Sequence, residues 1–217
     1  MVLINIIGSN AIGKSTRVTT LVDFLDQYDF SVIQYDTPAK GLKEVGKLYE
    51  TPQGKIFVYG NYQEKKKIWI GLDNAYLSKL EDRLNFMKYM SELGCDTFIQ
   101  EGYFNNGSKK MTMNEIKDFG ISSYKYFFFL YNEVQEYIDR TNGRTGNSRN
   151  EDWALNSAGW KNNLANFKMR DFYLEALKKD SGCSVYSLTK DEPKDYFVTK
   201  FFNRKHEIKQ KEQISIF

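Results

Sequence analysis

Histidine and cysteine are scarce in this sequence, which has one histidine and two cysteines among its 217 residues. His206 lies in the charged tail segment NRKHEIKQKEQ, where it is not expected to act as a catalytic base, and no second histidine is present to complete a zinc site. Cys95 and Cys183 each stand before an apolar, β-rich run, without another cysteine or histidine at metal-ligand spacing. Ser-His catalysis and zinc chemistry are therefore excluded, and both thiols are expected in or near the core.

Long apolar runs are also missing. None approaches the roughly 18 residues that a membrane span needs, and the segment MVLINIIGSN lacks the charged region and cleavage site of a secretory signal. The net charge of +3 is too small to predict a nucleic-acid partner by itself. No repeat, low-complexity segment or linker divides the chain. We therefore expect one cytoplasmic domain over residues 1–217, without a membrane partner.

A glycine-rich motif follows the first apolar run. The segment GSNAIGKST, which starts at Gly8, satisfies G-x-x-x-x-G-K-[ST], whose backbone amides cradle phosphate oxygens. A buried-strand pattern precedes it and an amphipathic helix pattern follows, so the helix N-terminus would face the bound anion. We expect Lys14 to reach the β- and γ-phosphates and Ser15 to ligate Mg²⁺. The predicted nucleotide-binding residues are Gly8, Asn10, Ala11, Ile12, Gly13, Lys14, Ser15 and Thr16.

Strand and helix patterns alternate along the rest of the chain. Strands are expected over 2–7, 31–36, 95–102, 124–132 and 183–189, and helices over 18–25, 73–93, 133–140, 164–177 and 191–202. Residues 42–71 are left unassigned apart from a turn at TPQG. The alternation predicts a three-layer α/β fold with a five-stranded parallel sheet and helices on both faces. Ligands of such sheets gather at the carboxyl ends of the strands.

Two carboxylates follow expected strands at that edge. Glu101, directly after TFIQ, is a candidate to hold a Mg²⁺-bound water or to orient an attacking hydroxyl, with an edge salt bridge as the alternative. Asp36, at the end of the second strand, is the other candidate base, and an Asx turn before Pro38 is its alternative. The sequence leaves open which of the two is the base.

Arginines and glycines share the segment TNGRTGNSRN. We expect a flexible lid over residues 140–150, in which Arg140 and Arg144 close over a transferring phosphoryl group. Tyr35, Asn61, Tyr62 and Asp73 are predicted to contact the acceptor, although Asp73 also suits a helix cap. The lysines of residues 65–67, with neighbouring aromatics, and the basic tail 204–217 suit a nucleic-acid backbone or a solvated face equally well.

The order of GSNAIGKST, YDTP, TFIQEG, DRTNGRTG and YSLTKDEP resembles the small P-loop kinases that phosphorylate nucleosides and nucleotides. The resemblance implies, in that order, a phosphate loop, an acceptor-side acid, a strand-end carboxylate, an arginine lid and a loop near the adenine of ATP. Two features differ from mononucleotide kinases. Residues 10–12 replace further glycines, and residues 40–75 contain no clear arginine motif for a nucleoside monophosphate.

The segment from VYGNYQ to WIGLDN is similar to phage-type kinases that act on hydroxymethylated pyrimidines, such as hydroxymethyluracil, in DNA. The expected function is therefore ATP- and Mg²⁺-dependent transfer of the γ-phosphate to a hydroxyl of a nucleoside-type acceptor, foremost a 5-hydroxymethyl pyrimidine base in DNA. A free nucleoside or nucleotide is the alternative acceptor. A P-loop NTPase switch without an acceptor is the second alternative.

Overall fold

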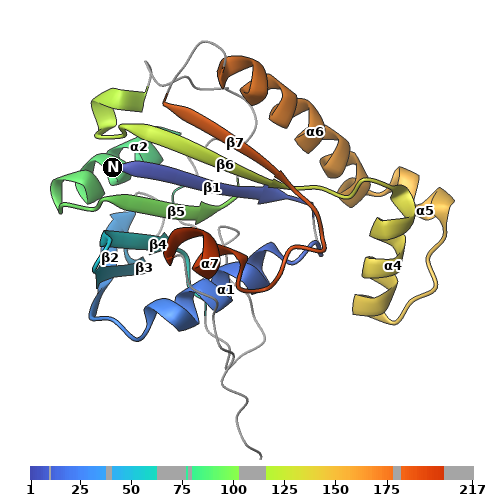
Figure 1. Cartoon of the computed structure of the whole chain (residues 1–217), viewed down its shortest axis with the longest axis horizontal. Helices are drawn as coiled ribbons and strands as arrows, with labels where there is room; N and C mark the ends of the chain where they lie inside the picture. The colour runs from blue at the N-terminus through green and yellow to red at the C-terminus, as the bar shows by residue number, and fades with distance from the viewer. Residues whose placement is uncertain are drawn as a thin grey trace, which may run out of the picture.

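The computed structural model describes residues 1–9, 11–37, 41–62, 77, 80–102, 116–177 and 182–202. Its elements are β1 (Val2–Gly8), α1 (Lys14–Leu25), β2 (Phe30–Thr37), β3 (Gly41–Thr51), β4 (Gly54–Tyr59), α2 (Leu80–Glu92), β5 (Thr97–Glu101), the 3₁₀ helix η3 (Lys117–Phe119), β6 (Ser123–Phe129), α4 (Val134–Thr145), α5 (Glu151–Asn156), α6 (Ala158–Leu177), β7 (Cys183–Leu188) and α7 (Tyr196–Phe202). One sheet lies between helices on its two faces (Figure 1).

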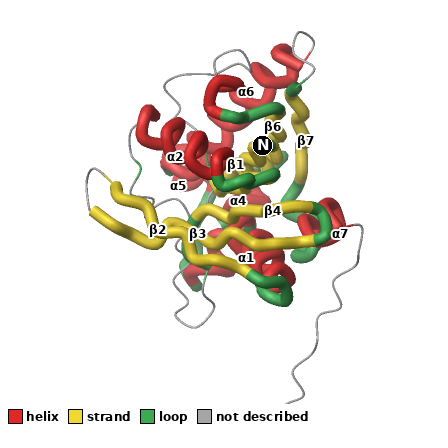
Figure 2. The backbone as a smooth tube through the Cα atoms, turned by 90° about the vertical axis from the view of Figure 1, so that its left-hand side faces the viewer, coloured by secondary structure: helices red, strands yellow, loops and turns green. Residues whose placement is uncertain are grey.

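The sheet is mixed and has seven strands in the order β2-β3-β4-β5-β1-β6-β7. The pairs from β4 to β7 are all parallel, whereas β2 pairs antiparallel with β3 and β3 with β4. The expectation of a purely parallel, five-stranded sheet is therefore wrong. Figure 2 shows β2 and β3 beyond β4 at the edge of the sheet.

The strand expected over 31–36 exists as β2, but it does not lie beside β5. The place next to β5 belongs to β4, which comes from the stretch left unassigned. A tight turn links β3 directly to β4. In this turn Gly54 takes φ 106°, and the Thr51 hydroxyl donates a 2.8 Å hydrogen bond to the Gly54 carbonyl. A short turn of this kind joins antiparallel strands, so β3 and β4 form a hairpin and β2 is displaced to the outside.

Alternating side chains give the sheet an apolar surface on each face. In β1, Ile4 and Ile6 pack with α1 and α7, whereas Leu3 and Ile7 pack with residues of α2 and α6. Both cysteines are buried, as expected. Among the described residues, no helix combines the length and apolarity needed to cross a membrane. The two-sided packing fixes β1 in the middle of the fold and its carboxyl end at the edge where the glycine-rich loop begins.

The first half of the arginine segment, residues 141–145, is helical where a loop was expected, whereas residues 146–150 are not helical. α4 continues past residue 140 to Thr145, and it ends only at Gly146, which takes φ 71°. The hydroxyls of Thr141 and Thr145 donate to the carbonyls of Tyr137 and Thr141, four residues earlier in each case. The helix therefore satisfies its own polar side chains through this segment. Arg140 and Arg144 lie on a helix, at positions set by its geometry.

Candidate functional site

The glycine-rich loop, residues 8–16, joins β1 to α1 as predicted. Gly8 lies so close to β6 that a Cβ there would be 2.3 Å from the Phe129 carbonyl oxygen. Ala11 takes φ 63°, a left-handed conformation that favours glycine, and Gly13 at the helix N-cap takes φ 92°. The loop therefore turns sharply, and the N-terminal amides of the 12-residue helix α1 face it.

The Lys14 ammonium group spans this loop. Its Nζ donates 2.9 Å hydrogen bonds to the carbonyls of Gly8 and Ser9 and lies 3.9 Å from Glu101 Oε1. The side chains of Lys14 and Glu101 are only 12% and 13% exposed. The positive charge is thus held over the mouth of the loop, at the carboxyl edge of the sheet.

Glu101 joins three segments that are distant in sequence. Its Oε1 accepts a 2.9 Å hydrogen bond from the Ser15 hydroxyl, and its Oε2 lies 3.5 Å from the Tyr62 hydroxyl, which donates to it. Mg²⁺ commonly takes one or two protein oxygens and fills its other positions with water and phosphate. The hydroxyl and carboxylate fit that requirement. The described part of the chain contains no cluster of three or more His, Cys, Asp or Glu for an all-protein site.

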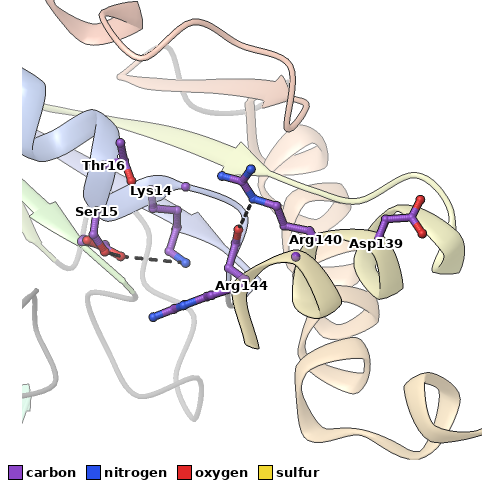
Figure 3. A pocket seen from close by; sticks show the side chains of 10 residues that line it. Lys14, Ser15, Thr16, Asp139, Arg140 and Arg144 are labelled. Atoms are coloured by element: carbon purple, nitrogen blue, oxygen red, sulfur yellow. Dashed lines mark hydrogen bonds and ion pairs between the residues drawn. The ribbon is translucent and has the colours of Figure 1, made fainter. Parts of the chain in front are cut away.

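A pocket of about 730 Å³ opens between the loop and α4 (Figure 3). It is lined by Ala11, Gly13, Lys14, Ser15, Thr16, Glu101, Asp139, Arg140, Gly143 and Arg144. Arg140 Nε donates a 3.0 Å hydrogen bond to the Ala11 carbonyl, and the Arg144 side chain extends into the pocket toward Lys14. Three cations therefore surround a cavity large enough for a small molecule.

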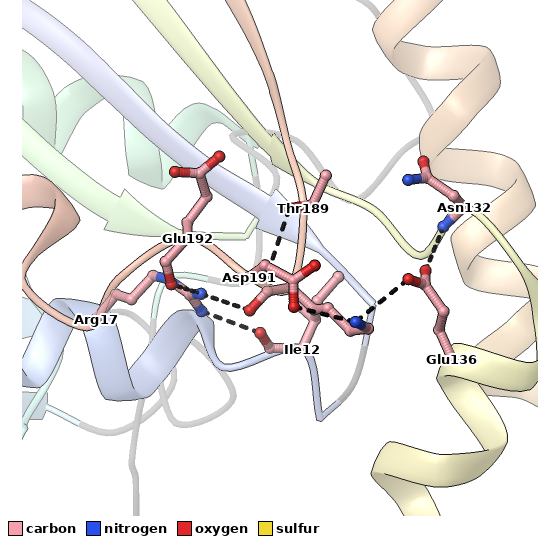
Figure 4. A network of polar contacts seen from close by, with 8 residues as sticks. Ile12, Arg17, Asn132, Glu136, Thr189, Asp191 and Glu192 are labelled. Carbon is pink, nitrogen blue, oxygen red and sulfur yellow. Dashed lines mark hydrogen bonds and ion pairs between the residues drawn. The ribbon is translucent and has the colours of Figure 1, made fainter.

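Arg17 lies behind the same loop, on the buried side of α1. Its Nη1 donates 3.1 Å hydrogen bonds to the carbonyls of Ile12 and Gly13. Its Nη2 donates to the carbonyls of Lys190 and Glu192, in the segment between β7 and α7 (Figure 4). Burial lowers the pKa of the Arg17 guanidinium, and the nearby charge of Glu192 opposes that shift. Arg17 thus joins the glycine-rich loop to the 190–192 segment.

The 190–192 segment is also tied to α4. The Lys190 ammonium lies 3.3 Å from Glu136 Oε1, and the other oxygen of Glu136 accepts a 2.9 Å hydrogen bond from the Asn132 backbone (Figure 4). Because Arg140 of the same helix holds Ala11, the contacts form a closed ring through the loop, the 190–192 segment and α4.

A buried amide on α6 fastens the start of the loop. Asn163 is fully buried, and its Oδ1 accepts hydrogen bonds from the Ser9 hydroxyl, at 2.9 Å, and from the Tyr131 backbone, at 3.0 Å. Its Nδ2 donates a 2.9 Å hydrogen bond to the Tyr131 carbonyl. One side chain therefore sets the distance between the loop and the chain that leads into α4.

Most of the predicted nucleotide-binding and catalytic residues lie around this pocket. Ile12 is a buried residue of the loop and Gly8 is the last residue of β1, and neither lines the pocket. Asn61 and Tyr62 line a small separate cavity beside β3, from which the Tyr62 hydroxyl reaches Glu101. Asn10, Asp73, the lysines of residues 65–67 and the tail 204–217 lie outside the described residues.

Two further predicted residues, Tyr35 and Asp36, lie apart from the pocket. Asp36 is exposed on β2, the outermost strand, and Tyr35 packs against Phe86 and Tyr89 of α2 instead of lining the pocket. Both belong to the hairpin edge, with β3, β4 and β5 between β2 and β1. The strand order therefore separates Asp36 from Glu101.

Sequence reasoning missed Asp139 and Arg17, and it assigned Gly143 to a flexible lid and not to a helix that lines the pocket. Arg17 carried a weak signal, because it directly follows GKST in a helix and stands before the apolar residues Val18 and Leu21. An arginine beside buried positions indicates polar partners inside the protein. Asp139 carried none, because its place in the pocket depends on how α4 lies against the loop.

The chain matches no model of a known protein family, and a search of curated proteins finds no match. Among solved structures, an unliganded sugar kinase from Janibacter sp. HTCC2649 is similar over 93% of this chain and 94% of its own chain, with 13% sequence identity and a TM-score of 0.41. A similarity this weak supports no inference about activity or substrate.

Proposed function

We propose that the chain is an ATP- and Mg²⁺-dependent phosphotransferase of the P-loop kinase type. The observation that carries the proposal is one pocket at the N-terminus of α1, where Lys14, Arg140 and Arg144 surround the hydrogen-bonded pair of Ser15 and Glu101. Phosphoryl transfer depends mainly on positioning the reactants and neutralising their charge. Cations around a helix N-terminus suit both tasks.

Each cation has a separate part in this proposal. Lys14 exchanges its hydrogen bonds to the Gly8 and Ser9 carbonyls for oxygens of the β- and γ-phosphates. Arg144 extends toward the same space and neutralises charge on the transferring group, so its contact is strongest in the transition state. Arg140 contacts the loop itself and holds the Ala11 carbonyl.

Glu101 is the proposed general base and one of the two proposed Mg²⁺ ligands. Its carboxylate is next to both Ser15 and Lys14, where it can orient an attacking hydroxyl or a metal-bound water. Ser15 and Glu101 would hold Mg²⁺, which when bound supplies positive charge to the phosphate oxygens. We assign the hydroxyl-orienting role to Glu101 and not to Asp36, because Asp36 lies on the outermost strand.

We propose a nucleoside-type acceptor, with a 5-hydroxymethyl pyrimidine in DNA as the first candidate. Support for the nucleoside class comes from the resemblance to small P-loop kinases, and support for DNA comes from the aromatic and lysine-rich stretch that begins near Tyr62. Tyr62 also donates to Glu101, so an acceptor bound at Tyr62 would lie next to the proposed base. A base in duplex DNA would first have to leave the stack.

Transfer of labelled γ-phosphate tests the proposal. ATP and GTP are supplied with free nucleosides, nucleoside monophosphates, an oligonucleotide that contains hydroxymethyluracil, and the same oligonucleotide without the hydroxymethyl group. We expect label on the modified oligonucleotide, and less of it at high salt, because backbone contacts by lysines release counterions. Lys14→Ala is the inactive control, and Lys161→Ala on the exposed surface of α6 is its matched active control.

The outcomes separate the candidates. Label on a free nucleoside or nucleotide, with none on the oligonucleotide, moves the acceptor to a small molecule. If phosphate is released from ATP or GTP as fast without an acceptor as with one, the result contradicts a kinase and favours the NTPase switch. Equal activity of Lys14→Ala and Lys161→Ala would contradict the site itself.

A further inference from the structure

Three consecutive carbonyl groups of the glycine-rich loop are held by guanidinium groups. Arg140 holds the carbonyl of Ala11, and Arg17 holds those of Ile12 and Gly13. In a planar trans peptide, the carbonyl of one residue and the N–H of the next point in opposite directions. The N–H groups of residues 12–14 are therefore turned away from the arginines. Gly13 and Lys14 line the pocket, so N–H groups that do not face the arginines are available to a ligand there.

Arg17 is itself held firmly. It is only 5% exposed, its guanidinium lies 4.8 Å from the centre of the Phe129 ring, and its Nη2 donates to the Lys190 and Glu192 carbonyls. A Cβ at Gly13 would lie 2.7 Å from Arg17 Nη1, so the loop and the guanidinium are in direct contact. The planar fork of arginine can engage several carbonyls at once, which an ammonium group cannot do in the same geometry.

The charge of Arg17 also bears on the pocket. Its hydrogen bonds to the loop and to the 190–192 segment go to carbonyl oxygens, which are dipoles and carry no full charge. Arginine keeps its proton in proteins. A positive charge therefore lies behind the loop, near enough to Arg140 to interact with it electrostatically, and the carboxylates of Glu192 and Asp191 partly offset it.

We propose that Arg17 is a positioning residue for phosphate binding: it holds the loop with its amides facing the pocket and fixes the loop to the 190–192 segment before any ligand binds. This inference rests on the proposed function, since it concerns the phosphate groups of the same nucleotide. Such preorganisation lowers the cost of binding and acts mainly on affinity. Arg17 does not touch the reacting atoms.

Binding of pyrophosphate and ADP, together with transfer kinetics, tests the role of Arg17. We expect Arg17→Met to raise the Kd for both ligands and the KM for ATP by about tenfold or more, and to change kcat by less than about threefold. Arg17→Lys keeps the charge but not the fork, so we expect an intermediate loss. Arg170→Met is the matched control, because that guanidinium also lies on an aromatic ring, 4.7 Å from Phe167, but it donates to Asp171 and Ser187 and not to the loop.

The ¹H–¹⁵N NMR signals of Gly13 and Lys14 supply a readout that a general loss of stability would not reproduce. In the unsubstituted protein, pyrophosphate should shift both signals, and in Arg17→Lys the shifts should require a higher concentration. Unchanged Kd values in folded Arg17→Met, or in Arg17→Lys if the methionine variant does not fold, would overturn the inference and leave the proposed function standing. If the unsubstituted protein binds neither ATP nor pyrophosphate, the proposed function fails and this inference fails with it.

Discussion

The Ser15 hydroxyl donates a 2.9 Å hydrogen bond to Glu101 Oε1 across 86 residues of sequence. Ser15 belongs to the first turn of α1, and Glu101 is the last residue of β5, the parallel neighbour of β1. Two oxygen groups that follow different strands thus meet beside the Lys14 ammonium group. This contact puts the candidate metal ligands and the candidate base at one point of the pocket.

Neutralising Glu101 should slow transfer while leaving nucleotide binding nearly intact. Glu101→Gln preserves the shape and can still accept from Ser15, but it loses the charge that orients a hydroxyl or a metal-bound water. We expect kcat to fall about 100-fold or more at saturating Mg²⁺. Asp36→Asn is the matched control on the outermost strand and should keep kcat. The opposite result, a fall in kcat in Asp36→Asn alone, would assign the role of general base to Asp36.

Removal of Arg144 should lower turnover more than ATP affinity. Its side chain extends into the pocket toward Lys14. A contact that strengthens as charge moves onto the transferring group acts on kcat, so we expect a fall of about 100-fold in Arg144→Ala with a small change in the Kd for ATP. Arg149→Ala is the control, because the Arg149 guanidinium lies 4.1 Å from the Trp153 ring. A change in Kd alone would make Arg144 a binding residue.

Truncation of Asn163 should destabilise the fold. Asn163→Ala leaves the buried N–H and C=O groups of Tyr131 and the Ser9 hydroxyl without that partner. We expect the free energy of unfolding to fall by about 2–4 kcal/mol in a urea titration. The exposed neighbour Asn162 offers the control. Asn162→Ala should change the free energy of unfolding by less than about 0.5 kcal/mol. Equal values for the two variants would show that the Asn163 contacts carry no net stability.

The Cys95 thiol should react slowly in the folded protein. Burial raises its pKa to about 11 by disfavouring the charged thiolate. At pH 8 only about one molecule in a thousand then carries the thiolate, which is the reactive form. Alkylation followed by peptide mass spectrometry should show little modification at residue 95 at pH 8, and faster modification as the pH rises. Complete modification in urea at pH 8 is the control, and rapid modification of the folded chain would contradict the buried thiol.

Local patterns were sufficient for the glycine-rich loop and for most of the strands. The strand before Gly8 and the helix after Gly13 were predicted correctly because both elements show their own periodicity over a few residues. Local residues also predicted the C-terminus of α2 and the N-terminus of α7. α2 ends just before Gly94, which takes φ 78°, and Pro193 precedes α7.

The sequence did not predict where α4 ends, because its last residues have a composition typical of a loop. Glycine and asparagine in TNGRTG lower helix propensity, so a lid was expected. In the structure, Thr141 and Thr145 hydrogen-bond to the preceding turn, and α4 runs through Gly143. The tertiary position of α4 against the glycine-rich loop, with Arg140 bonded to Ala11, decided which arginines face the pocket.

The sequence by itself determined the chemistry that is available at the loop, since the lysine, the hydroxyl and the glycines lie within one short motif. Only the tertiary structure decided that β4, and not β2, stands beside β5, and that Glu101 and not Asp36 meets Ser15. It also decided that Arg17 holds the loop from behind. The physical reason is that strand neighbours and buried polar partners are chosen by hydrogen bonds and packing between distant segments, which local periodicity does not record.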